Sequence, residues 1–201
     1  MRSPGIHCLW VLVIGVLAGC ASGVKPQAIA PFDAAQAKKM LGPGANSIHG
    51  AAYLWLSTGG LLSCAGESAT LYPATAYARQ WAKAVYQDVE NGKAQPPDFF
   101  YRPANEEPHQ FPVDSAFLAH ARTVACDPEG QFSFENVADG DFFVVAKLVW
   151  QRHVFDEHSY FYGKRYHDFE GSVIRAVHVQ GGIPTKAKMT WSVPNTRLGL
   201  W

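Results

Sequence analysis

The densest group of side chains that could do chemistry lies between residues 153 and 168. Histidine nitrogens and carboxylates together ligate zinc or copper when a fold brings them to one point. The spacing here matches no recognised ligand set, so a solvated hairpin tip is the simpler interpretation. The group consists of His153, Asp156, Glu157, His158, His167 and Asp168. We therefore expect no bound metal or other cofactor, and keep a metal-binding protein or metal-dependent enzyme as an alternative.

The same stretch is rich in aromatic residues, which can stack on sugar rings or receive the apolar side chains of a partner. We expect Trp150 and Phe155 to pack in the core of the domain. The candidates for contact with a ligand or partner are Tyr160, Tyr162, Tyr166, His153 and His158. Such a surface would suit a protein or a glycan partner, neither of which the sequence identifies.

The arrangements that activate a nucleophile or cradle a phosphate are missing from the sequence. It contains no Gly-x-Ser-x-Gly elbow, no His-Glu-x-x-His zinc motif and no Cys-x-x-Cys pair. The 17 lysines and arginines balance 17 aspartates and glutamates, so there is no basic excess of the kind that nucleic acid requires. We expect a protein that is not an enzyme and does not bind nucleic acid.

The N-terminus carries a second chemical signal, a cysteine at the end of a short apolar run. Arg2 supplies a positive charge, residues 9–18 are uncharged and apolar, and Leu17-Ala18-Gly19-Cys20 follows. A run of about ten residues is too short for a helix that must cross a bilayer with roughly 20. Residues 1–19 are therefore expected to be an export signal that is removed.

Leu-Ala-Gly-Cys resembles the lipobox of bacterial lipoproteins. The resemblance implies cleavage before Cys20 and attachment of lipid to its thiol. Several acyl chains, at about 0.8 kcal/mol per buried CH₂, would make membrane anchoring effectively permanent. In such lipoproteins an aspartate after the cysteine favours the inner membrane, and this chain has Ala21 there. The resemblance thus implies a lipid anchor in the outer membrane, with the domain facing the periplasm.

Two cysteines remain in the mature chain once Cys8 leaves with the signal and Cys20 carries lipid. Disulfides form in oxidising compartments outside the cytoplasm. We therefore expect Cys64 and Cys126 to pair.

The elements that must position these residues are mostly short strands. Residues 20–46 are rich in Ala, Gly, Pro and Gln without a period-2 pattern, and we interpret them as a flexible tether in which 34–41 could form a short helix. A single helix is expected from an apolar stripe at Tyr77, Trp81, Ala84, Val85 and Val89, ended by Asn91-Gly92. Residues 93–114 are expected to form a long proline-rich loop. Strands are expected over 48–58, 67–72, 117–125, 131–135, 141–155, 169–180 and 185–193.

The segment 127–145 resembles the carboxypeptidase regulatory-like domain, in which glycines form two turns and aromatic residues enter the core. The matching residues are Asp127, Gly130, Phe132, Phe134, Gly140, Asp141 and Phe142. The resemblance implies a mainly β fold: a transthyretin-like (prealbumin-like) antiparallel β-sandwich, here with one inserted helix and the proline-rich loop. We expect this domain to span residues 47–195, followed by a tail over 196–201. The zinc catalytic domain that such a module accompanies in carboxypeptidases is missing from this chain.

The leading hypothesis is a non-catalytic lipoprotein of the bacterial envelope that acts as a binding or structural module. Besides the metal-dependent alternative, a carbohydrate-binding module is the third hypothesis, because exposed aromatic rings suit sugars.

Overall fold

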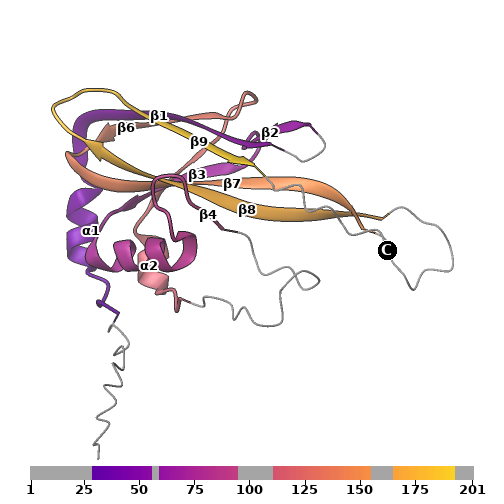
Figure 1. Cartoon of the computed structure of the whole chain (residues 1–201). Coiled ribbons are helices and arrows are strands. Elements are labelled where there is room, and N and C mark those ends of the chain that lie inside the picture. Colours follow the sequence, from indigo (N-terminus) through magenta and orange to yellow (C-terminus); the bar gives the residue numbers. More distant parts are fainter. Residues whose placement is uncertain (1–28, 56–58, 95–110, 155–164, 193–201) are drawn as a thin grey trace, which may run out of the picture.

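Two β-sheets pack face to face in a computed structural model that describes residues 29–55, 59–94, 111–154 and 165–192 (Figure 1). One sheet has four strands, which are β1 (Pro43–Trp55), β2 (Leu61–Ser63), β6 (Gln131–Val137) and β9 (Thr185–Ser192). The other has five, in the order β4 (Lys93–Ala94), β8 (Arg165–Val179), β7 (Gly140–Val154), β3 (Ser68–Pro73) and β5 (Arg122–Ala125). The mainly β sandwich expected from the sequence is confirmed.

The space between the sheets is filled by alternate residues of facing strands, as a period of two requires. The largest fully buried side chains of this core include Ile48, Leu54, Phe134, Phe142 and Leu148. Gly50 belongs to the same inward row, and a Cβ there would lie 2.2 Å from the ring of Phe132 on the neighbouring strand. Glycine is needed at this position because the ring of Phe132 packs directly on the backbone of β1.

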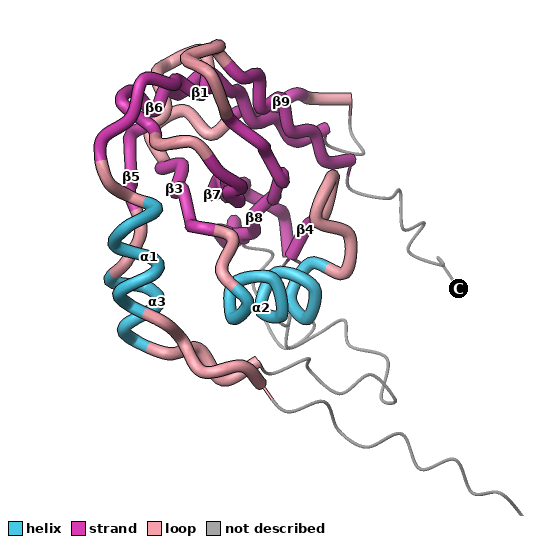
Figure 2. Tube along the Cα trace, turned by 90° about the vertical axis from the view of Figure 1, so that its left-hand side faces the viewer, coloured by secondary structure: helices cyan, strands magenta, loops and turns pink. Residues whose placement is uncertain are grey.

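A second apolar core covers the other face of the five-stranded sheet (Figure 2). It is formed by helices α2 (Ala76–Tyr86) and α3 (Ser115–Ala119), whose N-caps are Thr75 and Asp114. Phe117 of α3 stacks on Tyr72 at 4.9 Å and lies 5.0 Å from Trp81 of α2. Among the described residues, no helix is long and apolar enough to span a bilayer.

The expected apolar stripe is confirmed at Tyr77 and Trp81, but the helix ends at Tyr86 instead of reaching Val89. The five-stranded sheet is covered on one face by the other sheet and on the other face by the helices. No described helix covers the outer face of the four-stranded sheet.

The expected tether over residues 20–46 is wrong for its described part, which belongs to the folded domain. Helix α1 (Ala34–Met40) begins after the N-cap Asp33, and β1 already starts at Pro43. Phe32 contacts the rings of Tyr77 and Phe117 at 5.7 and 5.8 Å. The composition of this segment gave no sign of these contacts because the partners lie far along the chain. Residues 20–28 and the expected tail 196–201 lie outside the described residues.

Two other expectations also need correction. The strand expected over 117–125 is divided into α3 and β5, because the side chain of Asp114 accepts a hydrogen bond from Ala116 N and starts a helical turn. The sandwich is also not wholly antiparallel, since β9 pairs with β1 in parallel from Ile48↔Thr185 to Trp55↔Ser192.

Asn46 holds three segments together at one end of the sandwich. Its side chain is buried, and its Nδ2 donates to Val137 O at 2.9 Å and to Asp139 Oδ1 at 2.8 Å. Its Oδ1 accepts from Gly182 N at 2.7 Å. The amide therefore joins β1 to the β6–β7 turn and to the β8–β9 loop. Because Asn46 is buried, water cannot take the place of these hydrogen bonds.

Replacing Asn46 by alanine should lower the free energy of unfolding by about 2 to 3 kcal/mol, because Asp139, Gly182 and Val137 lose a buried partner. Urea unfolding followed by tryptophan fluorescence measures the change. The control is Asn91→Ala, which removes an exposed amide bonded to Arg175 and should change stability by less than about 0.5 kcal/mol. Equal losses in both variants would contradict the role of Asn46.

Candidate functional site

An open groove of about 620 Å³ lies over the outer face of the four-stranded sheet, the face without a helical cover. Its lining comes from β1, β6 and β9, together with the end of β5 and the turn that follows. The lining residues are His49, Gly50, Ala51, Tyr53, Ala125, Asp127, Gln131, Phe132, Ser133, Lys186 and Lys188. Aromatic, cationic and hydrogen-bonding side chains therefore meet on one surface.

Ala51 forms the floor of the groove, because it is the smallest side chain in its row across the sheet. It pairs with Lys188 of β9 on one side and with Gln131 of β6 on the other. His49 and Tyr53 each lie two residues from Ala51 on the same face of β1, so each is roughly 7 Å from Ala51 along the strand and the two are roughly 14 Å apart. A ligand lying over Ala51 would have a ring at either end and polar groups at both sides.

The imidazole of His49 is fixed by two hydroxyl groups. Ser133 Oγ lies 3.1 Å from its Nδ1, and Ser47 Oγ lies 3.0 Å from its Nε2. Ser133 donates its only hydroxyl proton to Glu135, so its oxygen must accept from Nδ1–H of His49. We assign the neutral ring as the Nδ1–H tautomer, whose Nε2 accepts from Ser47. The edge of the groove at His49 is thus held in place before any ligand arrives.

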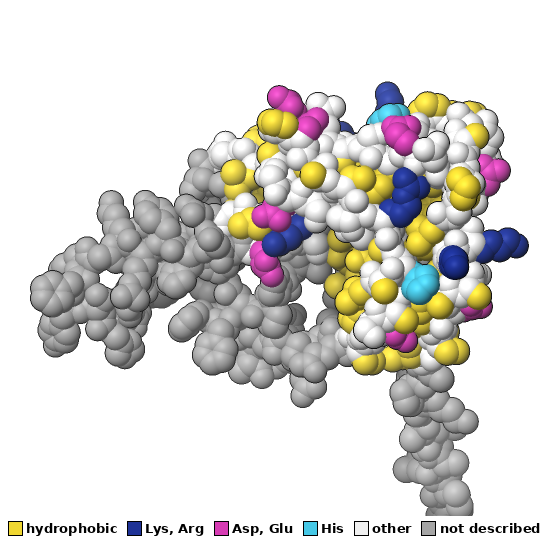
Figure 3. Space-filling model, turned by 180° about the vertical axis from the view of Figure 1, so that it is seen from behind, with side chains coloured by type: hydrophobic (Ala, Val, Ile, Leu, Met, Phe, Trp, Pro, Cys, Tyr) yellow, Lys and Arg dark blue, Asp and Glu magenta, His cyan; other side chains and the backbone are white. Residues whose placement is uncertain are grey.

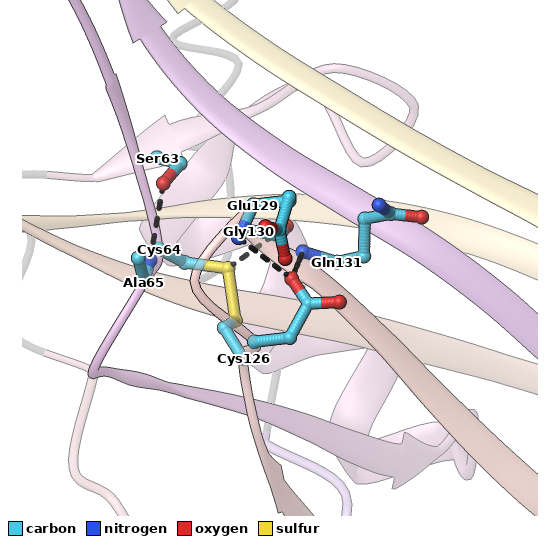
Figure 4. Close-up of a disulfide and its surroundings, with 8 residues drawn as sticks. Ser63, Cys64, Ala65, Cys126, Glu129, Gly130 and Gln131 are labelled. Atoms are coloured by element: carbon cyan, nitrogen blue, oxygen red, sulfur yellow. Dashed lines mark hydrogen bonds between the residues drawn. A yellow bond between two sulfur atoms is a disulfide. The ribbon is translucent and has the colours of Figure 1, made fainter.

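The disulfide between Cys64 and Cys126 lies beside the groove (Figure 4). Cys64 follows β2 of one sheet and Cys126 follows β5 of the other, so the bond ties the two layers together. The two cysteines are 62 residues apart, with a Cα–Cα distance of 5.8 Å. Closing a loop of that size contributes about 4 kcal/mol in the chain-entropy model. The pairing expected from the sequence is confirmed.

The turn after Cys126 leads directly into the groove. Asp127 Oδ1 accepts from Glu129 N at 3.0 Å and from Gln131 N at 2.7 Å, which fixes the start of β6. Gly130 has a φ of 77°, a conformation that favours glycine. These bonds place Gln131 opposite Ala51 in the groove.

Of the contact residues expected from the sequence, the structure places only two, His153 and Tyr166. His153 of β7 pairs with Tyr166 of β8 near the end of the long β7–β8 hairpin, away from the groove. His158, Tyr160 and Tyr162 lie outside the described residues, as does Phe155. In the described part of the chain, no three potential metal-ligating side chains meet. Trp150 is buried as expected, with its ring 5.5 Å from that of Trp191.

The groove residues were visible in the sequence only as strand residues. The alternation of polar and apolar residues in 185–193 predicts that Lys186 and Lys188 point outward, and both side chains are exposed. What the sequence did not show is that β9 lies beside β1. That pairing brings the lysines next to His49 and Ala51.

A second polar cluster joins α2 to one end of strands β7 and β8 in the five-stranded sheet. Asp141 bonds Arg79 at 2.7 Å and His178 Nδ1 at 2.6 Å, all three being largely solvent-accessible. The hydrogen bond from His178, and then that from Arg79, lowers the pKa of Asp141. Asp141, and then Gln180, raises the pKa of His178. The hydrogen-bond partners of His178 include neither a hydroxyl nor a thiol, so this cluster is a surface ion pair and not an activated nucleophile.

Apolar side chains gather at the helical end of the described surface, whereas charges of both signs are spread over the rest of that face (Figure 3). The exposed apolar residues near this end are Ile29, Val113 and Leu118. They lie on the side of the molecule occupied by α2 and α3, away from the groove.

Comparisons with known proteins show a similar fold but identify no family for this chain. No protein family matches the chain, and no curated protein matches it either. The structure is similar to the crystal structure of a proposed carbohydrate-binding protein, PA1324, from Pseudomonas aeruginosa. The TM-score is 0.57 with 20% sequence identity, over 81% of this chain and 99% of that chain. At this identity the similarity shows a shared β-rich fold.

The Asp141–His178 pair gives a prediction for pH dependence. His178 is charged below its raised pKa and Asp141 above its lowered pKa, so the pair should stabilise the fold between these two values. Its contribution should be fully present near pH 5.5 and be lost as the pH rises through the pKa of His178. In Asp141→Asn, NMR titration should show the pKa of His178 falling toward its ordinary 6.5. Glu90→Gln, which removes a carboxylate elsewhere, should leave that titration unchanged, and a similar fall there would contradict the assignment.

Proposed function

We propose that this protein is a carbohydrate-binding module of the bacterial envelope. The observation that carries the proposal is the open groove on the uncovered sheet face, in which two rings flank the small side chain of Ala51. A sugar ring has an apolar face that stacks on aromatic rings and a rim of hydroxyls that exchange hydrogen bonds. The groove offers both kinds of contact at once, with Tyr53 for stacking and Gln131 for hydrogen bonding.

The aromatic surface continues along β1 beyond the groove. Trp55 is 48% exposed and lies two residues after Tyr53 on the same face of the sheet. Leu61 of β2, which pairs with Trp55 of β1, is similarly exposed at 49%. Several sugar units of one chain could therefore be contacted in a line along β1, which suits a polysaccharide better than a single monosaccharide.

The role proposed for the Pseudomonas protein supports the same class of ligand. That protein shares the fold across nearly its whole length, and its name describes carbohydrate binding. A fold hosts many functions, so the groove of this chain, and not the shared fold, supports carbohydrate binding here.

We further propose that the module is held on the outer membrane by lipid on Cys20. Cys20 precedes Ile29 by nine residues, which can span about 30 Å when extended. Ala30 N bonds Gln80 Oε1 of α2 at 2.7 Å, so the chain joins the domain on its helical side. The groove is on the opposite layer (Figure 1). This arrangement would leave the groove facing away from the membrane and open to glycans.

Tyr53→Ala should weaken polysaccharide binding about tenfold, because the stacking surface is removed while the strand remains. Affinity electrophoresis through gels containing a panel of envelope and extracellular polysaccharides measures the effect. Tyr53→Phe should retain most of the affinity, since the ring remains. Ile183→Ala, which removes an exposed apolar side chain outside the groove, should leave binding unchanged. Failure of the unaltered protein to bind any polysaccharide would contradict the proposed function.

Cys20→Ser should release the protein from the membrane fraction into the periplasm, because a serine cannot carry the thioether-linked lipid. Cell fractionation followed by mass spectrometry of the mature N-terminus measures this. Cys8→Ser, within the expected signal, should leave membrane association unchanged. An unmodified first residue in the unaltered protein would contradict the anchor without affecting the argument for the groove.

A further inference from the structure

We infer that the groove selects an acidic glycan, a polysaccharide whose sugar units carry carboxylates. This inference rests on the proposed function and goes further by naming the chemical class of the ligand. The carboxylates would lie over β9, and the hydroxyl groups would face β6.

The cationic wall of the groove is formed by Lys186 and Lys188. Both side chains are exposed, and both point to the groove side of β9 at a spacing of roughly 7 Å. The strand Thr185–Ser192 contains no acidic residue, and no ion pair involves either lysine in the part of the chain that the structure describes. By contrast, exposed Lys147 on the other sheet has Glu67 and Glu170 within 3.5 Å. Two cations thus line a binding surface without a counter-charge of their own.

The opposite wall carries two acidic side chains, Asp127 and Glu135, so an anionic group of a ligand is favoured on the β9 side and not on the β6 side. The Asp127 carboxylate faces the amides of its own turn, and Glu135 accepts the hydroxyl proton of Ser133. The side chains that remain at this wall are neutral, namely Gln131 and the hydroxyl of Ser133. Since β1 lies between β9 and β6, the two walls are separated by about 10 Å, two strand spacings. A chain lying along β1 would therefore have its charged groups at one side and its hydroxyls at the other.

An acidic protein segment would also be attracted by the two lysines. The rest of the groove favours the sugar, because the rings of His49 and Tyr53 on either side of Ala51 offer stacking surfaces at the spacing of same-face strand residues. We therefore commit to the glycan and use an acidic peptide as a competing probe.

The experiment compares each acidic polysaccharide with its own neutral form, using the full-length protein in detergent. The probes are polygalacturonate, alginate and hyaluronan, each with a carboxyl-reduced or methyl-esterified counterpart, and polyglutamate. Affinity is measured by calorimetry at 50 and 300 mM salt. At least one acidic polysaccharide should bind about tenfold more tightly than its neutral form, and the difference should shrink at the higher salt concentration because added ions screen exposed charges.

The double variant Lys186→Gln/Lys188→Gln should bind the acidic and neutral forms equally. The matched control is Lys38→Gln/Lys39→Gln, which removes two exposed lysines from α1 and should retain the preference. Equal binding of acidic and neutral forms by the unaltered protein would overturn this inference and leave the carbohydrate-binding function standing. Polyglutamate binding as tightly as the best polysaccharide would also overturn it. Binding to no polysaccharide, acidic or neutral, would overturn the proposed function itself.

Discussion

Strand β1 is the constraint on which the rest of the structure depends, because it is hydrogen-bonded along both edges. One edge pairs with β9, and the other pairs with β6 and then with β2. Its inward residues, such as Ile48 and Leu54, are fully buried in the core, so its register cannot slip by one residue without exposing them. The same register determines that His49, Ala51 and Tyr53 face outward together. The groove is thus a direct consequence of how the core is packed.

The groove lies on the one sheet face that neither the other sheet nor a described helix covers. The five-stranded sheet has apolar residues on both faces, such as Phe142 inward and Phe143 outward, and needs the helical layer to cover the second face. The outer face of the four-stranded sheet is mixed, with charged residues such as Lys186 beside aromatic residues such as Tyr53, and no described helix covers it. The Cys64–Cys126 disulfide and the hydrogen bonds of the buried Asn46 amide hold the ends of the strands around the groove. The groove is therefore lined mainly by sheet strands and not by loops.

Local patterns predicted most of the sandwich, while pairing between distant strands determined the site. Alternation identified the inner and outer residues of β9, and the turn at Asp127 identified the start of β6. The sequence could not show that β9 adds to β1 in parallel, since 137 residues separate Ile48 from its partner Thr185. The described part of the expected tether was misassigned for a similar reason, because Asn46 and Phe32 find their partners far along the chain. Composition favoured the 153–168 hairpin as a site because its aromatic and polar residues are close in sequence.

The distribution of charge implies that the proposed selection by this groove would act only at contact distance. The chain has no net formal charge, so no overall field attracts an anionic polymer from solution. At physiological salt the field of an exposed charge is screened within about 8 Å, which is close to the distance between Lys186 and Lys188 along β9. Only a ligand already seated beside Ala51 would experience both lysines. In the proposed function, stacking on the rings of β1 would therefore supply much of the affinity, and the lysines would discriminate between chains that carry carboxylates and chains that do not.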